Sequence, residues 1–464
     1  MHSVRGGAAL VKSLDRSNHL EQCVTLDIPD ERIDWRSKGF WLPDGPVTAA
    51  QLAAARPGLF DGGFTWPMLV LRRSAAAANI ATMAAFCARH GLDFAPHAKT
   101  TMAPGLLAAQ LDAGAWGMTV ATANQALVLR RLGVPRVVIA NQVLDPTALR
   151  WLAQESARGW EVYLQVDSEA GVAAAAAAIG GPGSGAVGSG AVGSGAVGSD
   201  PGGSGVVGST GTGGRLRVLV ELGHSGGRTG CRTVPQLVVV ARAVTGVAGL
   251  ELCGVTGYEG ALDAQAEVDA FLSELADGAR ALAAAGLLGP RVLVSAGGSA
   301  WFDRVAALLA GQWLPGHELR TVLRSGASVT HDDGMYADCT PFRRVPAEGP
   351  LAAALDLYAQ VLSVPEPGLA LVGMGKRDAP FDGGLPVPRS VRRPDGTAIA
   401  ADGLAVTRLN DHHAYLKVAP GAVLTPGDIV RFGISHPCTA FDKWRHIPVV
   451  DDDLRVVDVL HTYF

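Results

Sequence analysis

Between residues 66 and 298, short apolar runs alternate with longer stretches rich in alanine and leucine. This alternation is typical of repeated strand-helix units whose parallel strands are buried on both faces. Eight runs occur: Trp66–Leu71, Asp93–Lys99, Gly117–Ala121, Val137–Asn141, Val162–Asp167, Val218–Gly223, Leu252–Tyr258 and Arg291–Ser295. The count of eight predicts an α/β fold, a closed (β/α)8 TIM barrel, over residues 46–310; an open doubly wound sheet is the alternative.

Beyond residue 310 the pattern changes to short strands separated by proline and glycine. The expected strands are Leu319–Arg324, Leu369–Val372, Ala414–Val418 and Ile429–Ile434. This pattern predicts a second, mainly β domain over residues 311–464. The segment 1–45 precedes the first barrel strand, and we expect it to pack on this second domain.

The stretch 180–214 differs from both domains because it is almost wholly glycine, serine, alanine and valine. It carries too little large apolar surface to offset the entropy lost on ordering, so we expect a flexible insertion in the barrel. Its five-residue repeat argues against a collagen-like helix, which needs glycine at every third position.

The composition narrows the class of partner. The 39 basic and 43 acidic residues give a formal charge of -4, which provides no broad basic surface for nucleic acid or an anionic membrane. The six cysteines include no Cys-x-x-Cys pair, which argues against a disulfide framework and a four-cysteine zinc site. No apolar run is long enough for a membrane span or a signal sequence. We therefore expect a cytoplasmic protein with a small-molecule partner.

The first candidate for chemistry is the run Pro96-His97-Ala98-Lys99-Thr100 at the end of the second strand. Strand alternation would place His97 and Lys99 on one face, toward the barrel axis. A buried lysine has a lowered pKa and can attack a carbonyl to form a Schiff base. A lysine that reaches from the strand end into solvent fits the same spacing.

Two glycine-rich loops follow other strands. Residues 221–230 read Glu-Leu-Gly-His-Ser-Gly-Gly-Arg-Thr-Gly, a loop whose glycines allow the backbone to approach a ligand. Residues 295–299 read Ser-Ala-Gly-Gly-Ser, in which free amides, a hydroxyl and a following helix start would make an anion cradle. A simple helix cap by Ser299 is the alternative for the second loop.

His436-Pro437-Cys438 is a candidate metal site after the last apolar run. Residues two apart on an extended segment share a face, so an imidazole and a thiolate can bind one borderline cation such as zinc. Two protein ligands leave positions open for water or substrate. A packed histidine beside an inert cysteine is the common alternative.

Together these motifs resemble the fold-type III pyridoxal-phosphate (PLP) enzymes, specifically the D-serine dehydratase and D-threonine aldolase branch related to alanine racemase. The resemblance implies a barrel followed by a β domain, with Lys99 as the cofactor lysine and His97 beside it. It also implies that Arg228 contacts the cofactor's phenolic oxygen and that Tyr258 lies near the cofactor ring. Gly297, Gly298 and Ser299 would bind the phosphate with Gly326 close by, although Ser328 stands where relatives often have tyrosine.

The resemblance further implies a function. His-x-Cys at His436 and Cys438 is similar to the zinc motif of D-serine dehydratases, whereas D-threonine aldolases carry His-x-Asp. We therefore expect a PLP- and zinc-dependent lyase that removes the β-hydroxyl of a D-amino acid and releases a keto acid and ammonia. Retro-aldol cleavage by a D-threonine aldolase is the alternative, and a non-catalytic PLP-binding protein is a third. The family usually forms homodimers, so a homodimer is expected too.

Overall fold

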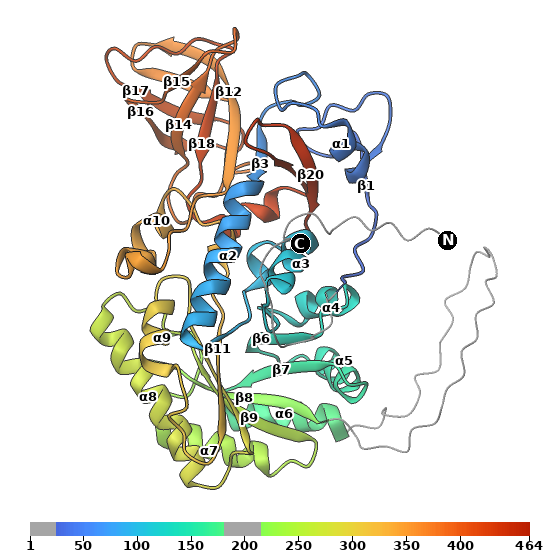
Figure 1. Ribbon diagram of the computed structural model, residues 1–464, viewed down its shortest axis with the longest axis vertical. Helices are drawn as coiled ribbons and strands as arrows, with labels where there is room; N and C mark the ends of the chain where they lie inside the picture. Colours follow the sequence, from blue (N-terminus) through green and yellow to red (C-terminus); the bar gives the residue numbers. More distant parts are fainter. Residues whose placement is uncertain (1–24, 181–214) are drawn as a thin grey trace, which may run out of the picture.

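The computed structural model describes residues 25–180 and 215–464. Figure 1 shows two domains stacked along the long axis, a barrel below and an antiparallel sheet domain above. Apart from residue 180, the predicted insertion lies outside the described residues. Among the described helices, none is both long and apolar enough to cross a membrane.

The barrel is an eight-stranded parallel sheet in the order β4-β11-β10-β9-β8-β7-β6-β5. An isolated parallel bridge between His97 and Thr119 joins its two edges. Its strands are β4 (Asp93–Phe94), β5 (Met118–Val120), β6 (Arg136–Gln142), β7 (Glu161–Val166), β8 (Leu216–Leu222), β9 (Leu250–Gly257), β10 (Arg291–Ala296) and β11 (Glu318–Leu323). The predicted barrel is confirmed.

Helices cover the outside of the barrel and bury an apolar layer against the strands. They are α2 (Arg73–His90), α3 (Pro104–Asp112), α4 (Ala123–Arg131), α5 (Pro146–Ala157), α6 (Glu169–Gly180), α7 (Val234–Thr245), α8 (Gln265–Ala284) and α9 (Phe302–Leu309). A separate apolar cluster fills the barrel interior, so the barrel is a packed core and not a pore.

The second domain contains the remaining long strands, paired mainly antiparallel around its own apolar core. They are β3 (Met68–Arg72), β12 (Leu355–Glu366), β13 (Leu369–Val372), β14 (Val387–Arg392), β15 (Ala398–Ala400), β16 (Leu404–Leu409), β17 (Ala414–Val418), β18 (Ile429–Gly433), β19 (His446–Val450) and β20 (Val456–His461). The expected mainly β domain is therefore present.

Two strands were assigned to the wrong domain. The run Trp66–Leu71 forms β3, which pairs with β12 and β19 in the second domain. Leu319–Arg324 lies mostly in β11, which pairs with β10 and β4 and completes the barrel. Both faces of β3 are buried, as in a barrel strand, so its composition carries no sign of the change. Strand β3 thus falls inside the range 46–310 predicted for the barrel, and β11 falls inside the range 311–464 predicted for the second domain.

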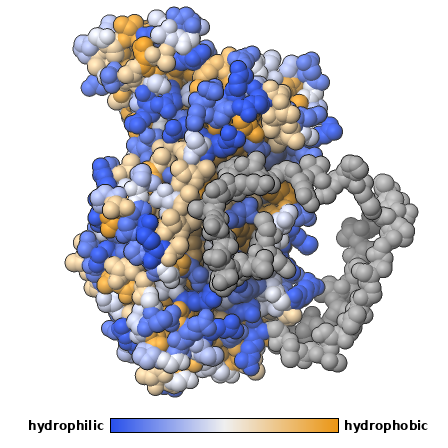
Figure 2. Space-filling view, viewed as in Figure 1, coloured by the Kyte–Doolittle hydropathy of each residue, from blue (hydrophilic) through white to orange (hydrophobic). Residues whose placement is uncertain are grey.

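The start of the described chain also packs on the second domain. Ile33 and Phe40 are buried in its core, close to β1 (Arg32–Ile33), β2 (Val47–Thr48) and α1 (Ala49–Ala55). Helix α2 then joins the domains, because Ile80 belongs to the core of the second domain and Phe86 to that of the barrel. Figure 2 shows polar and apolar residues mixed over this face, with a pale orange strip along the alanine-rich α2.

Candidate active site

The barrel interior changes from apolar to polar toward the carboxyl ends of its strands. On four strands an apolar interior residue is followed two positions later by a buried polar one: Gln165, Glu221, Ser295 and Arg324. Residues two apart on a strand point to the same side, so these side chains line the barrel mouth. The Arg324 guanidinium donates to Ser295 Oγ at 2.7 Å and to Thr256 Oγ1 at 2.6 Å. Hydrogen bonds thus fix this polar layer in place.

Lys99 lies at this mouth, on the short 3-10 helix η1 (Ala98–Thr100) that follows β4. The regular strand ends at Phe94, since Pro96 has no amide hydrogen to continue the ladder. The prediction that His97 and Lys99 share one strand face is therefore wrong in its geometry. Both residues nevertheless lie at the carboxyl end of the strand, where the barrel places catalytic groups.

Three positive groups gather at the mouth: Lys99, Arg228 and Arg324. Burial lowers the pKa of Lys99; the charge of Cys438 opposes this shift, whereas the two guanidiniums add to it. Burial and the same three cations hold the pKa of His97 well below its usual value. Its Nδ1 is buried and has no hydrogen-bond partner among the described residues. A neutral imidazole beside several cations suits an anionic ligand.

In the predicted anion-binding loop, a carboxylate of the protein itself accepts hydrogen bonds from the backbone amides. Gly297 donates its N–H to Glu259 Oε2 at 3.0 Å, and Gly298 donates to Glu259 Oε1 at 2.5 Å. These two amides are therefore not free for a phosphate, contrary to the expectation. Glycine is still required at 297, where φ is +99° and a Cβ atom would lie 2.1 Å from Leu323 Cδ1.

Ser299 instead lines a small cavity of about 10 Å³, which is about the space that one water molecule needs. The short helix η2 (Ala327–Val329) lies on one side of it, and Thr340 lies on another. Within the described chain, the buried hydroxyl groups of Ser328 and Thr340 have no hydrogen-bond partners. An unpaired buried hydroxyl donor costs free energy, and these donors suit a hydrogen-bond acceptor such as a phosphate oxygen of PLP.

Gly326 brings η2 against η1. A Cβ atom there would lie 2.7 Å from His97 Cβ and 2.8 Å from Thr100 Oγ1, so glycine permits this close approach. The Arg228 guanidinium carbon lies 4.7 Å from the centroid of the Tyr258 ring. The cation-π contact orients an arginine that is otherwise exposed. The structure thus brings Lys99, Arg228 and Tyr258 to the same barrel mouth as Arg324.

The predicted metal pair reaches the same mouth from the loop after β18. Cys438 lies on η5 (Pro437–Thr439), which packs against η1, and its Sγ is 3.2 Å from Thr100 Oγ1. His436 hydrogen-bonds Cys438, and this bond raises the pKa of His436 to about 9. Burial acts in the opposite direction on this pKa but is outweighed. An imidazole and a sulfur that already contact each other can close on one divalent cation.

Several residues that sequence reasoning missed hold the metal pair in place. His436 Nδ1 is 2.7 Å from Asp382 Oδ2, which leaves Nε2 for a ligand. The backbone N–H of His436 donates to Asp332 Oδ2 at 2.8 Å. The ring of Tyr336 lies edge-on to His436, on α10 (Met335–Cys339). Asp382 and Asp332 lie in irregular connections and Tyr336 lies on a five-residue helix, and no recognisable spacing links them to His436 in the sequence.

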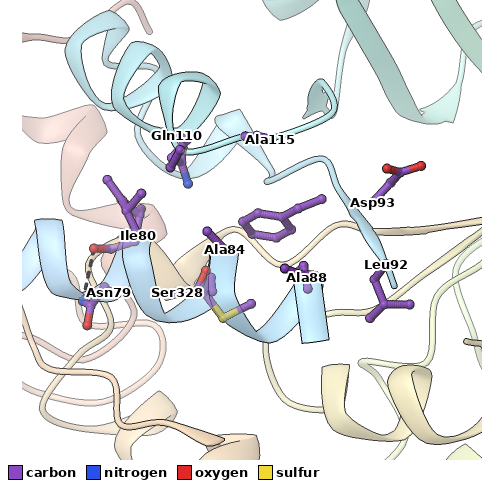
Figure 3. A pocket seen from close by; sticks show the side chains of 15 residues that line it. Asn79, Ile80, Ala84, Ala88, Leu92, Asp93, Gln110, Ala115 and Ser328 are labelled. Atoms are coloured by element: carbon purple, nitrogen blue, oxygen red, sulfur yellow. Dashed lines mark hydrogen bonds between the residues drawn. The ribbon is translucent and has the colours of Figure 1, made fainter. Parts of the chain in front are cut away.

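A larger cavity of about 270 Å³ lies elsewhere, outside the barrel between α2 and α3 (Figure 3). Ile80, Ala84 and Ala88 line it from α2, and Gln110 lines it from α3. It contains none of the predicted site residues, and its lining is mostly apolar. The site at the barrel mouth is therefore selected by its chemistry and not by cavity size.

Comparison with known families agrees with this geometry. Residues 71–316 match the family model of the alanine racemase N-terminal domain, and residues 354–450 match that of the putative serine dehydratase domain. The chain belongs to the alanine racemase-like, fold-type III PLP enzymes. This confirms the resemblance drawn from the motifs, and it supports PLP as the cofactor.

Individual relatives place the chain in the D-threonine aldolase-like branch of this family. A D-threonine aldolase of Arthrobacter sp. is 25% identical over 408 residues, covering 86% of this chain and 92% of the relative. A 3-hydroxy-D-aspartate aldolase of Paracoccus denitrificans (strain Pd 1222) is 24% identical over 381 residues, covering 79% and 87%. These relatives are lyases, and the chain is an enzyme of the same class, which removes the non-catalytic alternative.

Solved structures show the same fold. A D-threonine aldolase from Filomicrobium marinum superposes with a TM-score of 0.66 at 23% identity, covering 86% of this chain and 94% of that one. A D-threo-3-hydroxyaspartate dehydratase from Delftia sp. HT23 superposes with a TM-score of 0.63 at 24% identity, covering 86% and 97%. Both aldolases and dehydratases therefore share this architecture.

Proposed function

We propose that the protein is a PLP- and zinc-dependent dehydratase of D-β-hydroxy-amino acids, which releases a keto acid and ammonia. The observation that carries the proposal is the meeting of Lys99 with the His436 and Cys438 pair at one barrel mouth. The pair reaches the lysine through the 3.2 Å contact between Thr100 and Cys438. Chemistry at the α-carbon and at the β-hydroxyl of one small substrate needs both groups within a few ångströms.

When bound, PLP supplies an electron sink for negative charge that develops at the substrate's α-carbon. Lys99 Nζ would hold the cofactor and then accept the α-proton. Burial lowers the pKa of Lys99, so more of the amine is free to act as a base near neutral pH. Arg228 and Arg324 add positive charge around the anionic cofactor and the substrate carboxylate.

His436 and Cys438 would hold the divalent cation, which supplies Lewis acidity at the β-hydroxyl. The thiolate is a soft ligand and favours zinc over manganese or magnesium. Asp382 keeps the His436 ring oriented through Nδ1.

Retro-aldol cleavage is the second candidate, since the curated relatives named above are aldolases. It would use the same lysine and the same metal pair, but a base would remove the proton of the β-hydroxyl group. The two reactions differ in their products. Dehydration gives a keto acid and ammonia, whereas cleavage gives glycine and an aldehyde.

The test uses purified protein reconstituted with PLP and zinc, and offered D-serine, D-threo-3-hydroxyaspartate and D-threonine in turn. We expect keto acid and ammonia, a visible absorption band from bound PLP, and loss of both in Lys99→Ala. Lys417→Ala, at an exposed lysine on β17, is the matched control. Glycine and aldehyde as the main products would replace dehydration with cleavage, and a colourless protein without turnover would overturn both candidates.

The quaternary state and compartment follow from the resemblance and composition alone. We propose a homodimer in the cytoplasm, with a small D-amino acid as the partner and no nucleic acid or membrane. Light scattering of the purified full-length chain tests the homodimer. A mass equal to one chain across a range of concentrations would contradict it.

A further inference from the structure

A second group of metal-binding residues lies away from the barrel mouth, where the first described residues meet the end of the chain. Glu31 precedes β1, and His446 and His461 are paired directly across β19 and β20. One ligand atom from each of the three lies within 4.8 Å of the other two. The imidazole centroids are 4.8 Å apart and their planes are perpendicular. A segment near the start of the described chain and two neighbouring strands near its end thus place ligand atoms close together.

The two imidazoles are buried and incompletely hydrogen-bonded. His446 is 4% exposed and His461 is 8% exposed. His446 Nε2 and His461 Nδ1 have no hydrogen-bond partner in the part of the chain that the structure describes. Two unpaired nitrogens in a buried cluster are costly unless something binds them.

The surroundings prepare these nitrogens to act as ligands. Ser37 Oγ lies 2.7 Å from His446 Nδ1 and can accept a hydrogen bond from the Nδ1–H group, and this tautomer leaves the Nε2 lone pair free to bind a metal. Burial, together with the neighbouring His461, lowers the pKa of His446 to about 4, so the ring is neutral at neutral pH. His461 Nδ1 and Glu31 Oε2 are 3.9 Å apart. Tetrahedral zinc with bonds of ~2.0–2.2 Å spaces its ligand atoms by ~3.4 Å, so this pair must close by ~0.5 Å and no pair in the cluster by more than ~1.4 Å.

We propose that Glu31, His446 and His461 form a second divalent-cation site that binds zinc. Two histidines and one carboxylate are a common zinc ligand set, and the fourth position is left for water. The site would clamp the segment around Glu31 onto strands β19 and β20. It is chemically distinct from the thiolate site at His436 and Cys438, and it has no part in the proposed reaction.

Arg445 competes with the cation for the same carboxylate. Its Nη2 lies 3.2 Å from Glu31 Oε2, and its side chain is 70% exposed and therefore able to move aside. Replacing Arg445 by glutamine should tighten zinc binding, because it removes the competing charge. If the two histidines have only a packing role and bind no zinc, Arg445→Gln would not increase the affinity for zinc.

The test counts zinc in full-length protein that lacks the first metal pair, His436→Ala/Cys438→Ala, after removal of metal by a chelator and reloading with zinc. We expect one zinc per chain, a rise in melting temperature on loading, and loss of both on addition of Glu31→Gln or His461→Ala. His317→Ala, outside the cluster, is the matched control and should keep the zinc. Cobalt in place of zinc should give ligand-field absorption without a thiolate charge-transfer band.

Two results would overturn the proposal. The first is a double variant that folds but holds no zinc. The second is zinc content and affinity that do not change with Glu31→Gln, His461→Ala and Arg445→Gln. If His461→Ala does not fold, the isosteric Glu31→Gln and the exposed Arg445→Gln still decide between binding and packing. The wild-type protein should hold two zinc ions per chain.

Discussion

Gly326→Ala tests whether the close approach of η2 to η1 positions Lys99. The backbone at Gly326 has φ of -108°, which alanine adopts without strain, so only the added methyl group matters. That methyl would meet His97 Cβ at 2.7 Å, His97 O at 2.8 Å and Thr100 Oγ1 at 2.8 Å. Carbon atoms in contact prefer ~3.5–4.0 Å, so η1 must move by about 1 Å. Two of these three atoms, His97 Cβ and His97 O, cannot rotate away.

A shift of this size at the lysine should lower turnover by about 100-fold, because a displacement of about 1 Å can cost that much in a positioned reaction. Overpacking should also lower the free energy of unfolding by about 1–3 kcal/mol. Turnover, PLP absorption and melting temperature measure the two effects. Gly289→Ala is the control, since its Cβ would meet nothing within 4 Å. If both variants behave alike in all three assays, the packing argument for Gly326 is refuted.

Three further predictions concern side chains at the mouth. Arg324→Met should lose at least about 2 kcal/mol of stability because it leaves Thr256 Oγ1, Ser295 Oγ and the Gly257 carbonyl oxygen without their charged donor; an unchanged thermal unfolding curve would contradict this. Iodoacetamide should label Cys438 in the native protein and zinc should block it, whereas burial raises the pKa of Cys253 to about 12 and keeps it unreactive; peptide mass spectrometry with equal labelling of both would count against it. Cys438→Asp should shift the metal preference from zinc toward manganese, because a carboxylate is a harder ligand than a thiolate; competition between the two ions that still favours zinc as strongly as in wild type would refute it.

The barrel was predictable because buried parallel strands leave a plain signal, and seven of the eight apolar runs contain barrel strands. The two strands predicted in the wrong domain, β3 and β11, have a common explanation. Strand β3 is buried on both faces inside an antiparallel sheet, and β11 alternates between exposed and buried residues at its start, as an antiparallel strand does. Each strand has the pattern expected of the other domain. Only the tertiary pairing tells them apart.

The site residues that belong to short sequence motifs could be predicted. The site residues that come from distant parts of the chain could not. Lys99, Arg228 and Cys438 lie at strand ends or in recognisable short motifs, and the fold brings them together. Glu259 was missed, because its position in the sequence gives no sign that its carboxylate accepts hydrogen bonds from the Gly297 and Gly298 amides. The Glu31 cluster depends on contacts across more than 400 residues of sequence, which no local pattern reveals.

The most direct test of the central claim is to treat the PLP-loaded protein with borohydride, which fixes a lysine-cofactor linkage, and to map the adduct by peptide mass spectrometry. The account predicts one adduct per chain, on Lys99, and none in Lys99→Ala. An adduct on another lysine, or a reduced protein with no adduct at all, would contradict it.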